Sequence, residues 1–268
     1  NHLGLDGIET REQLAQVKQL VVRYARQLAV LNADDPLCLA MSSDMDPARL
    51  CLVGESMGPH LAAHQQAGGL IATIHEDQRG PMLRLQRGTF VCGEMPLSAI
   101  PATWGAKFRP AMINALFAAA LAHGLGISFS TIEQALTTFV SDYSSNPGRM
   151  NRISGVPFEL WLSWSDGPLA LKELSTFIDA RRYDVGSKSL VFYLVGNRPD
   201  DFIRASAQAV AGTFDRYFCT DMEEDRRGRP VGEVAALLAD SLRQSGVPES
   251  RTVVDPSTTR VIREALAS

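Results

Sequence analysis

Charged side chains of both signs are concentrated in residues 219–230 (CTDMEEDRRGRP). Between residues 221 and 229 this stretch holds four carboxylates and three guanidinium groups. Such a loop could bind a zwitterion, with guanidinium groups on its carboxylate and carboxylates on its amine. A solvated loop with local ion pairs explains the same composition. The candidate substrate-binding residues are Asp221, Glu223, Asp225, Arg226 and Arg229.

A second polar turn, GNRPDD (residues 196–201), follows an apolar run. Its backbone amides and Arg198 could bind an anion at the start of the next helix. Asp200 or Asp201 acting as an ordinary helix N-cap is the alternative. If the preceding runs are parallel strands, both polar turns lie at one edge of the sheet, where ligands bind.

A third candidate is Arg149, which stands on the Pro-Gly turn of NPGRMN (residues 146–151). The turn separates two halves of the chain with different patterns of predicted elements, and the second half alternates strand-like and helix-like segments. The residues alone leave the role of an arginine at such a boundary open.

The first half of the chain is predicted to contain both helices and strands. Residues 10–25 have helical spacing, with Thr10 as N-cap and Gln13 completing a capping box. Three strand-like runs lie in residues 28–36, 48–56 and 69–77, and residues 81–101 alternate as an antiparallel meander does. Two helices are expected, at residues 111–123 and at 131–140. We expect Ser130 to cap the second, with Glu133 in the capping-box position.

The second half predicts four strand–helix pairs. The pattern indicates a doubly wound parallel sheet with helices on both faces, and the fold class is α/β. We place the domain boundary within residues 144–151. The expected strands are 158–164, 188–197, 214–221 and 251–255, and the expected helices are 169–182, 200–212, 231–246 and 258–267.

Composition excludes several classes of function. The hydrophobic fraction is 45%, the charged fraction 21% and the net charge −4, so nothing suggests a nucleic-acid or membrane partner. Cys38, Cys51, Cys92 and Cys219 lie far apart, as expected of reduced thiols in a cytoplasmic protein. No phosphate-binding GxxxxGK[ST] motif and no GxSxG motif occurs. The chain begins without Met and ends in a helix-like run, and we expect it to be part of a longer protein.

Five stretches stand in order along the chain: NHLG (residues 1–4), VLNADDP (30–36), INALFAAALAHGLGI (113–127), NPGRMN (146–151) and the charged stretch that begins DMEEDRRGRP (221–230). Together they resemble the Mur ligase superfamily and, within it, the ligase half of the cyanophycin synthetases. The resemblance runs over nearly the whole chain, and the motifs are more specific together than singly.

The resemblance implies a partial ATPase domain with a mixed sheet at residues 1–147 and a Rossmann-like domain at 148–268. It implies an ATP-dependent amide-bond ligase that forms an acyl phosphate, uses ATP and Mg²⁺, and adds an amino acid to an aspartate carboxylate. Arginine is the amino acid that this half of the cyanophycin synthetases adds. The implied partners are that amino acid, a polymer or peptide primer, and further copies of the chain in a homo-oligomer.

Roles for single residues also follow from the resemblance. Asn114 is similar to the asparagine on the adenine side of the nucleotide, and Arg149 would lie against the nucleotide when the domains close. His2 is similar to a histidine that binds magnesium. Lys18 lies near the position of a carbamylated lysine, although a solvated helix lysine explains it equally well. The 221–229 loop would recognise the incoming amino acid.

One motif departs from the family. At the opening of the C-terminal domain an Asp-Tyr-Ala-His-Asn-Pro run is usual, whereas this chain has Ser163-Trp164-Ser165-Asp166-Gly167-Pro168. Ser163 replaces the aspartate expected at the ribose, and Asp166 replaces the histidine. These replacements weaken the expected nucleotide contacts and leave two alternatives open: a catalytically degenerate module that scaffolds or holds polymer, and a Mur-type ligase for another amino acid.

Overall fold

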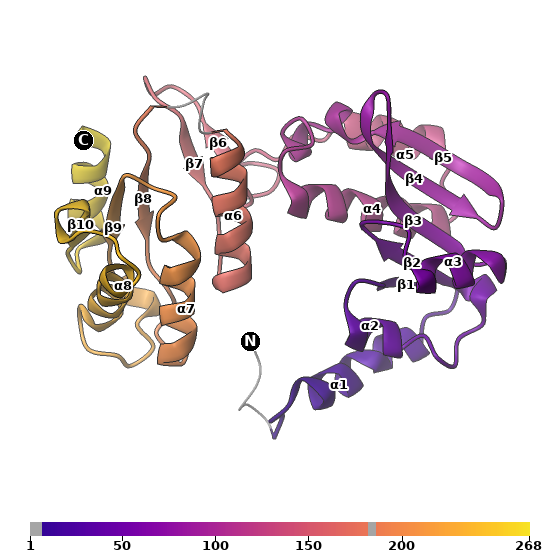
Figure 1. Ribbon diagram of the computed structural model, residues 1–268, viewed down its shortest axis with the longest axis horizontal. Coiled ribbons are helices and arrows are strands. Elements are labelled where there is room, and N and C mark those ends of the chain that lie inside the picture. The colour runs from indigo at the N-terminus through magenta and orange to yellow at the C-terminus, as the bar shows by residue number, and fades with distance from the viewer. Residues whose placement is uncertain (1–6, 182–185) are drawn as a thin grey trace. The chain divides into compact units, whose positions relative to one another are not determined.

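The structure is a computed structural model that describes residues 7–181 and 186–268. The chain forms two compact units, Asn1–Ser141 and Asp142–Ser268 (Figure 1). We call them the N-terminal unit and the C-terminal unit and describe each by itself. Their assignment to the two Mur ligase domains, with a boundary at residue 147, stays a prediction.

The N-terminal unit is built on a mixed five-stranded sheet with the strand order β1-β2-β3-β4-β5. The first three strands are parallel, whereas β4 and β5 each run antiparallel to the preceding strand. The predicted meander is therefore confirmed. The strands are β1 (Ala29–Asn32), β2 (Leu50–Gly54), β3 (Leu70–Asp77), β4 (Gly80–Arg87) and β5 (Phe90–Pro96).

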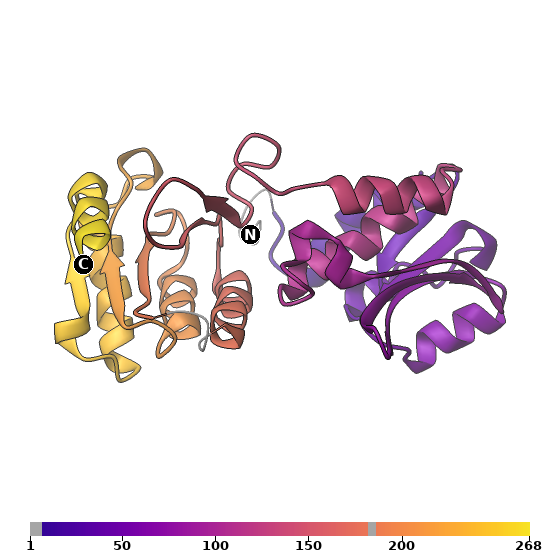
Figure 2. The same ribbon diagram turned by 90° about the horizontal axis from the view of Figure 1, so that it is seen from above.

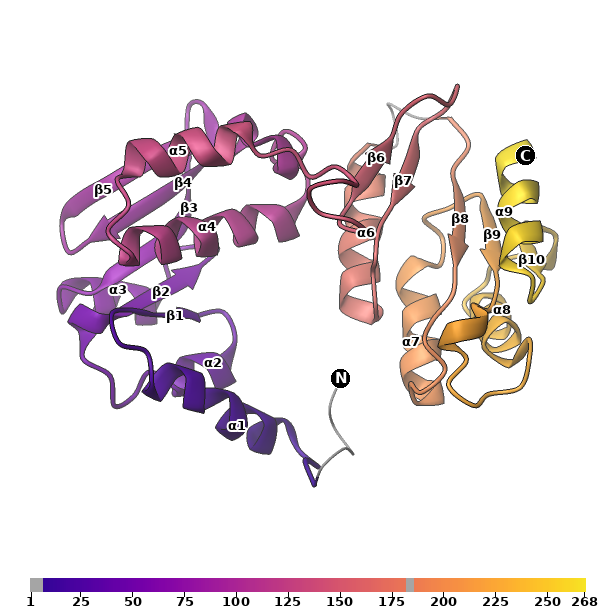
Figure 3. The same cartoon turned by 180° about the vertical axis from the view of Figure 1, so that it is seen from behind.

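Helices cover both faces of this sheet because side chains of the parallel strands alternate between two cores. Leu50 and Leu52 of β2 face one cluster with Val22 and Leu61, and Cys51 and Val53 face the other. Figure 3 shows α4 and α5 together on one face. The helices are α1 (Arg11–Arg23), α2 (Pro36–Ala40), α3 (Pro59–Gln66), α4 (Arg109–Gly124) and α5 (Phe129–Thr138), with short 3₁₀ turns at Pro47–Arg49, Leu97–Ala99 and Pro101–Thr103.

Local signals place the start of α1 but not that of α5. Thr10 caps α1, and Gln13 completes the predicted capping box. The predicted cap of α5 was wrong, because Ser128 and not Ser130 accepts the hydrogen bond from the Thr131 amide. Tertiary packing explains the earlier start: the ring of Phe129 lies against Gly93, where a Cβ would come within 1.9 Å of the ring.

The C-terminal unit contains a parallel sheet of three strands with the order β10-β9-β8. The first predicted strand, within residues 158–164, does not pair with this sheet. It forms an antiparallel ladder with the preceding segment, which closes only a short loop and so costs little chain entropy. The strands are β6 (Asn151–Ile153), β7 (Leu160–Leu162), β8 (Ser189–Phe192), β9 (Arg216–Cys219) and β10 (Thr252–Val254).

Helices cover both faces of the parallel sheet, as the alternating pattern predicts. Helices α6, α7 and α8 contact one another in series, and α9 packs on β8 and β9 from the opposite face (Figure 2). No helix within residues 7–181 and 186–268 has the length and apolar character needed to cross a membrane. The helices are α6 (Pro168–Ala180), α7 (Asp200–Val210), α8 (Glu233–Gln244) and α9 (Thr258–Ala267), with 3₁₀ turns at Glu223–Asp225 and Glu249–Arg251.

Candidate functional site

The two predicted polar turns meet at the carboxyl edge of the parallel sheet. We call residues 195–199, which follow β8, the β8 loop, and residues 220–232, which follow β9, the charged loop. The Gly196 amide donates to the Asp225 carbonyl at 2.7 Å. A Cβ on Gly196 would come within 1.9 Å of the Arg226 carbonyl oxygen. The backbones approach so closely that only glycine fits at this position.

Arg229 holds the same two loops together through its side chain. Its Nε donates to the Gly196 carbonyl at 2.6 Å, and one terminal nitrogen donates to the Arg198 carbonyl at 2.8 Å. The guanidinium also pairs with Asp200 at 2.8 Å and Glu233 at 2.6 Å. These partners use most of the donors of one guanidinium. We therefore assign Arg229 to the scaffold of the site, not to the proposed substrate contacts.

Asp221 is also part of this scaffold. Its side chain is buried, and its two oxygens accept hydrogen bonds from the amides of Gly232 at 2.5 Å and Ala235 at 3.0 Å. These amides belong to the start of α8, where backbone N–H groups lack partners within the helix. Asp221 thus caps α8 from a distant position in the sequence, and its oxygens are occupied by protein.

The middle of the charged loop, residues 223–226, carries the remaining candidates. Glu223 pairs with Arg226 at 3.4 Å, and Asp225 pairs with Arg227 at 3.4 Å. The hydroxyl of Tyr193 donates to the second oxygen of Asp225 at 3.3 Å. Burial is the main cause of a raised pKa of Tyr193, and the negative charge of Asp225 adds to it. Tyr193 was not predicted as a site residue, because nothing in the apolar run around it marks its hydroxyl as facing the loop.

Arg198 does not stand open at a helix start. It pairs with Asp166 at 2.5 Å and lies 5.6 Å from the centre of the Phe202 ring. Neither Asp200 nor Asp201 caps α7, whose N-cap is Pro199 without a side-chain hydrogen bond. The N-cap alternative for this turn is therefore wrong, whereas an anion contact at the turn stays a prediction. Arg198 forms an ion pair with Asp166, and Asp200 forms one with Arg229.

The Pro-Gly-Arg turn is held from inside by a buried asparagine. The side chain of Asn151 accepts from the Gly148 amide at 2.6 Å and donates to the Asn146 carbonyl at 3.0 Å. The Trp164 amide donates to the Gly148 carbonyl at 2.7 Å. Gly148 has a positive φ of 73°, and Arg149, which follows it, is exposed. The turn therefore presents Arg149 from a fixed backbone, and sequence reasoning missed the role of Asn151.

A second polar edge lies in the N-terminal unit, where β1 and β2 end. Asp34 accepts from the Glu55 amide at 2.9 Å, and burial raises the pKa of its carboxyl group. Glu55 forms an ion pair with Arg109 at the start of α4. Asp35 caps α2 through the amides of residues 37 and 38. The VLNADDP element thus has a structural role at this edge.

The other candidates of the N-terminal unit lie apart from one another in the chain. Lys18 is exposed on α1 and close enough to Cys38 to influence its pKa, which burial raises. Asn114 is exposed on α4. His2 lies outside the described residues. Within the described ranges 7–181 and 186–268, no group of three His, Cys, Asp or Glu side chains could hold a metal ion.

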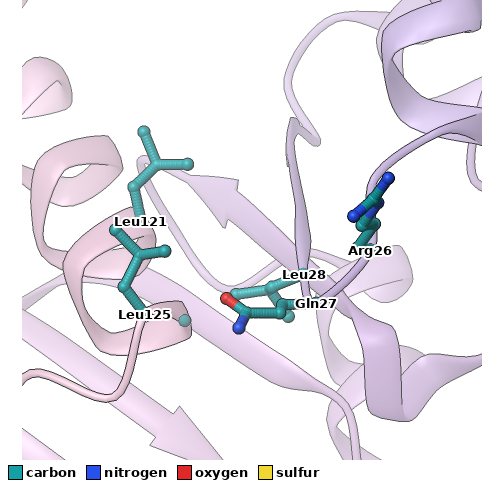
Figure 4. A pocket seen from close by; sticks show the side chains of 6 residues that line it. Arg26, Gln27, Leu28, Leu121 and Leu125 are labelled. Carbon is teal, nitrogen blue, oxygen red and sulfur yellow. The ribbon is translucent and has the colours of Figure 1, made fainter.

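A pocket of about 370 Å³ lies away from these groups. Figure 4 shows Leu121 of α4 and Leu125, the C-cap of that helix, facing Gln27 and Leu28, which precede β1. The pocket therefore lies at the amino end of β1, whereas Asp34 and Asp35 follow the carboxyl end of the same strand. Because its lining is mostly apolar and its charged group is Arg26, we do not assign the chemistry to it.

No family model matches the chain. The chain is 28% identical over 246 residues to a cyanophycin synthetase of Synechocystis sp., and 29% identical over 247 residues to one of Crocosphaera subtropica. These matches cover 91% and 90% of the chain and 27% of each relative. The chain thus spans about a quarter of the length of the curated relatives it matches.

Solved structures show the same fold at low identity. A pseudomurein peptide ligase type C from Methanothermus fervidus has a TM-score of 0.62 at 17% identity, covering 99% of this chain and 56% of that one. Mycobacterium tuberculosis folylpolyglutamate synthase, complexed with ADP, has a TM-score of 0.57 at 15% identity, with coverage of 91% and 56%. The predicted resemblance and the α/β fold class are thereby confirmed: the chain is a homologue of cyanophycin synthetases and has a Mur ligase-like fold.

Proposed function

We propose that the chain is part of an ATP-dependent amide-bond ligase of the cyanophycin synthetase type. In the proposed reaction a carboxylate takes the terminal phosphoryl group of ATP, and ADP leaves. The amine of an incoming amino acid then forms the amide bond, loses a proton and displaces phosphate. We further propose that the amino acid is arginine, that the carboxylate belongs to an aspartate in a primer, and that the protein works as a homo-oligomer.

One observation carries this proposal: the similarity to cyanophycin synthetases covers about nine-tenths of the chain and both compact units. A second supports it. At the carboxyl edge of the parallel sheet in the C-terminal unit, two loops present charged side chains from a braced backbone. Ligands of open α/β sheets bind at such an edge.

The proposed nucleotide contacts are Asn114 and Arg149. Both side chains are exposed. An amide can donate to and accept from a base, and a guanidinium can contact phosphate oxygens. The proposals that His2 binds Mg²⁺ and that Lys18 takes part in catalysis rest on the resemblance alone. No cluster of three His, Cys, Asp or Glu side chains suited to a metal ion lies among the described residues, and we derive no step through the ion.

The proposed contacts to the amino acid come from the middle of the charged loop: the exposed Glu223 and the partly buried Asp225 and Arg226. Carboxylates there can receive a cationic side chain, and a guanidinium can receive the carboxylate of an amino acid. Arg198 is already paired with Asp166. It is therefore a weaker candidate for substrate binding than these three.

A second function, a catalytically inactive scaffold or polymer-binding module, is favoured by one feature. Ser163 stands where the resemblance places a ribose-binding aspartate, and its hydroxyl lies 3.0 Å from that of Ser165. Asp166, in place of a histidine, is bound to Arg198. Both side chains contact neighbours in the same unit, so the motif has acquired local partners.

The test is release of ADP by the full-length protein, followed with a cyanophycin-like primer and with arginine, lysine or aspartate added in turn. We expect release that requires both arginine and primer. Release with a different amino acid would indicate another Mur-type ligase. No release from folded protein with any amino acid would favour the scaffold.

A further inference from the structure

Tyr193 follows the last residue of β8, at the edge of the sheet where the charged loop lies. Its side chain is half-buried, and its hydroxyl reaches Asp225 across the two loops at 3.3 Å. We propose that Tyr193 is a positioning residue that fixes the Asp225 carboxylate, so that Asp225 receives the cationic side chain of the incoming amino acid. This inference rests on the proposed function and adds to it a residue that sets specificity.

The two oxygens of Asp225 have different surroundings. Oδ2 accepts from Tyr193, whereas Oδ1 faces Arg227 at 3.4 Å. The Arg227 side chain is 56% exposed, and so long a contact from a solvated guanidinium contributes little free energy. A guanidinium from the chain itself thus already reaches Oδ1, and a guanidinium or ammonium group of a ligand can replace it.

The backbone on which Asp225 stands is fixed from two sides. The Gly196 amide donates to the Asp225 carbonyl at 2.7 Å, and Arg229 binds the carbonyls of Gly196 and Arg198. The remaining freedom is the rotation of the Asp225 side chain, which the Tyr193 hydroxyl restricts. Specificity sites depend on such fixed rotamers because ordering a side chain on binding costs affinity.

The tyrosine hydroxyl suits this task because it stays a donor. Burial and the neighbouring Asp225 raise the pKa of Tyr193, so the hydroxyl keeps its proton at neutral pH. A phenylalanine would fill the same space but would leave Oδ2 without its donor. The Tyr193→Phe variant therefore removes one hydrogen bond and leaves the aromatic packing in place.

The first experiment measures binding, independently of turnover. Calorimetric titration of the full-length protein with arginine and with citrulline, its neutral isostere, is done with and without a non-hydrolysable ATP analogue. We expect the wild-type protein to prefer arginine. Tyr193→Phe should weaken arginine binding about tenfold and leave citrulline binding unchanged. Asp225→Asn should abolish the preference.

The control is Tyr24→Phe, at the exposed tyrosine that follows α1, and this variant should bind arginine as the wild-type protein does. Thermal unfolding of each variant verifies that the units stay folded. Unchanged arginine affinity in folded Tyr193→Phe would overturn the proposal. So would a wild-type protein that binds citrulline as tightly as arginine.

Turnover separates this inference from the function on which it rests. In an active enzyme Tyr193→Phe should raise the KM for arginine about tenfold and leave the KM for ATP unchanged. A wild-type protein that prefers arginine in binding but never releases ADP would refute the ligase and keep the role of Tyr193. An active enzyme with an unaltered KM for arginine in Tyr193→Phe would refute the role of Tyr193 and keep the ligase.

Discussion

At the scale of single residues, Asp221 shows how a predicted ligand contact can belong to the scaffold. It is 2% exposed and accepts two backbone hydrogen bonds at the start of α8. Replacing it with Ala leaves two amides without a partner, and we expect a loss of about 2–3 kcal/mol in the free energy of unfolding of the C-terminal unit. Urea unfolding, followed by the near-ultraviolet signal of tyrosine and tryptophan, measures this loss.

Glu223 offers a matched control on the same loop. Its side chain is 82% exposed, so Glu223→Ala should change stability by less than about 0.5 kcal/mol. Hydrogen exchange at the amides of Gly232 and Ala235 should accelerate only in the Asp221 variant. Equal stability of the two variants would show that Asp221 does not support α8.

We expect His64 to make the stability of the N-terminal unit depend on pH. Its ring is buried, with Nε2 at 3.1 Å from the Leu50 carbonyl, and burial lowers the pKa of the ring below its ordinary value of 6.5. The unfolded chain therefore binds a proton more readily than the folded unit does. The contribution of the neutral His64 ring to the free energy of unfolding is therefore fully present above pH 6.5 and decreases as the pH falls below that value.

The variant His64→Gln should flatten this dependence, measured as the urea midpoint of the N-terminal unit between pH 7.5 and 5.5. The pKa of His123 is also lowered by burial, so part of the slope should remain. His60→Gln, at an exposed position on the same helix, is the control. If His64→Gln keeps the full slope of the wild-type protein, His64 is not its source.

At the scale of elements, the approach of the two loops depends on Gly196. A Cβ there would come within 1.9 Å of a backbone oxygen of Arg226, which cannot turn away as a side chain can. Gly196→Ala should therefore separate the loops, cost about 1–3 kcal/mol in stability, and weaken arginine binding. Gly186→Ala, where a Cβ has no neighbour within 4 Å, should leave both unchanged. Urea unfolding and calorimetric titration test both variants, and a Gly196→Ala protein with native stability and affinity would contradict this account.

Elements defined by local chemistry are predictable from the sequence. The capping box of α1 and the apolar runs of β1, β2 and β3 lie where the patterns place them, since capping and strand alternation are properties of neighbouring residues. Prediction fails where distant contacts decide. Phe129 packing against Gly93 moves the start of α5, and pairing with β6 separates β7 from the parallel sheet.

The candidate site divides in the same way. The polar turns after β8 and β9 are visible in the sequence because parallel strands bring their carboxyl ends to one edge. The partners of each charged group are not visible. Arg198 pairs with Asp166, and Arg229 with Asp200, across more than 25 residues of chain. Which carboxylate stays accessible to a ligand therefore depends on tertiary structure.

At the scale of the whole molecule, the Pro-Gly-Arg turn stands near the division of the chain into its two units. The turn belongs to the C-terminal unit, where Asn151 and the Trp164 amide fix its backbone. We propose that Arg149 contacts the nucleotide in the ligase reaction. Its role would then be catalytic, whereas that of Asn151 is structural.

The two roles predict opposite results for two substitutions in one turn. Arg149→Ala should lower ADP release at least about tenfold and leave the free energy of unfolding unchanged, because its side chain is exposed. Asn151→Ala should cost about 1–3 kcal/mol in stability, because its amide is fully buried and supports the turn on both sides. Steady-state ADP release and urea unfolding of both variants give the comparison. Full activity in Arg149→Ala would remove the arginine from the reaction, and the turn would then serve only to connect the two units.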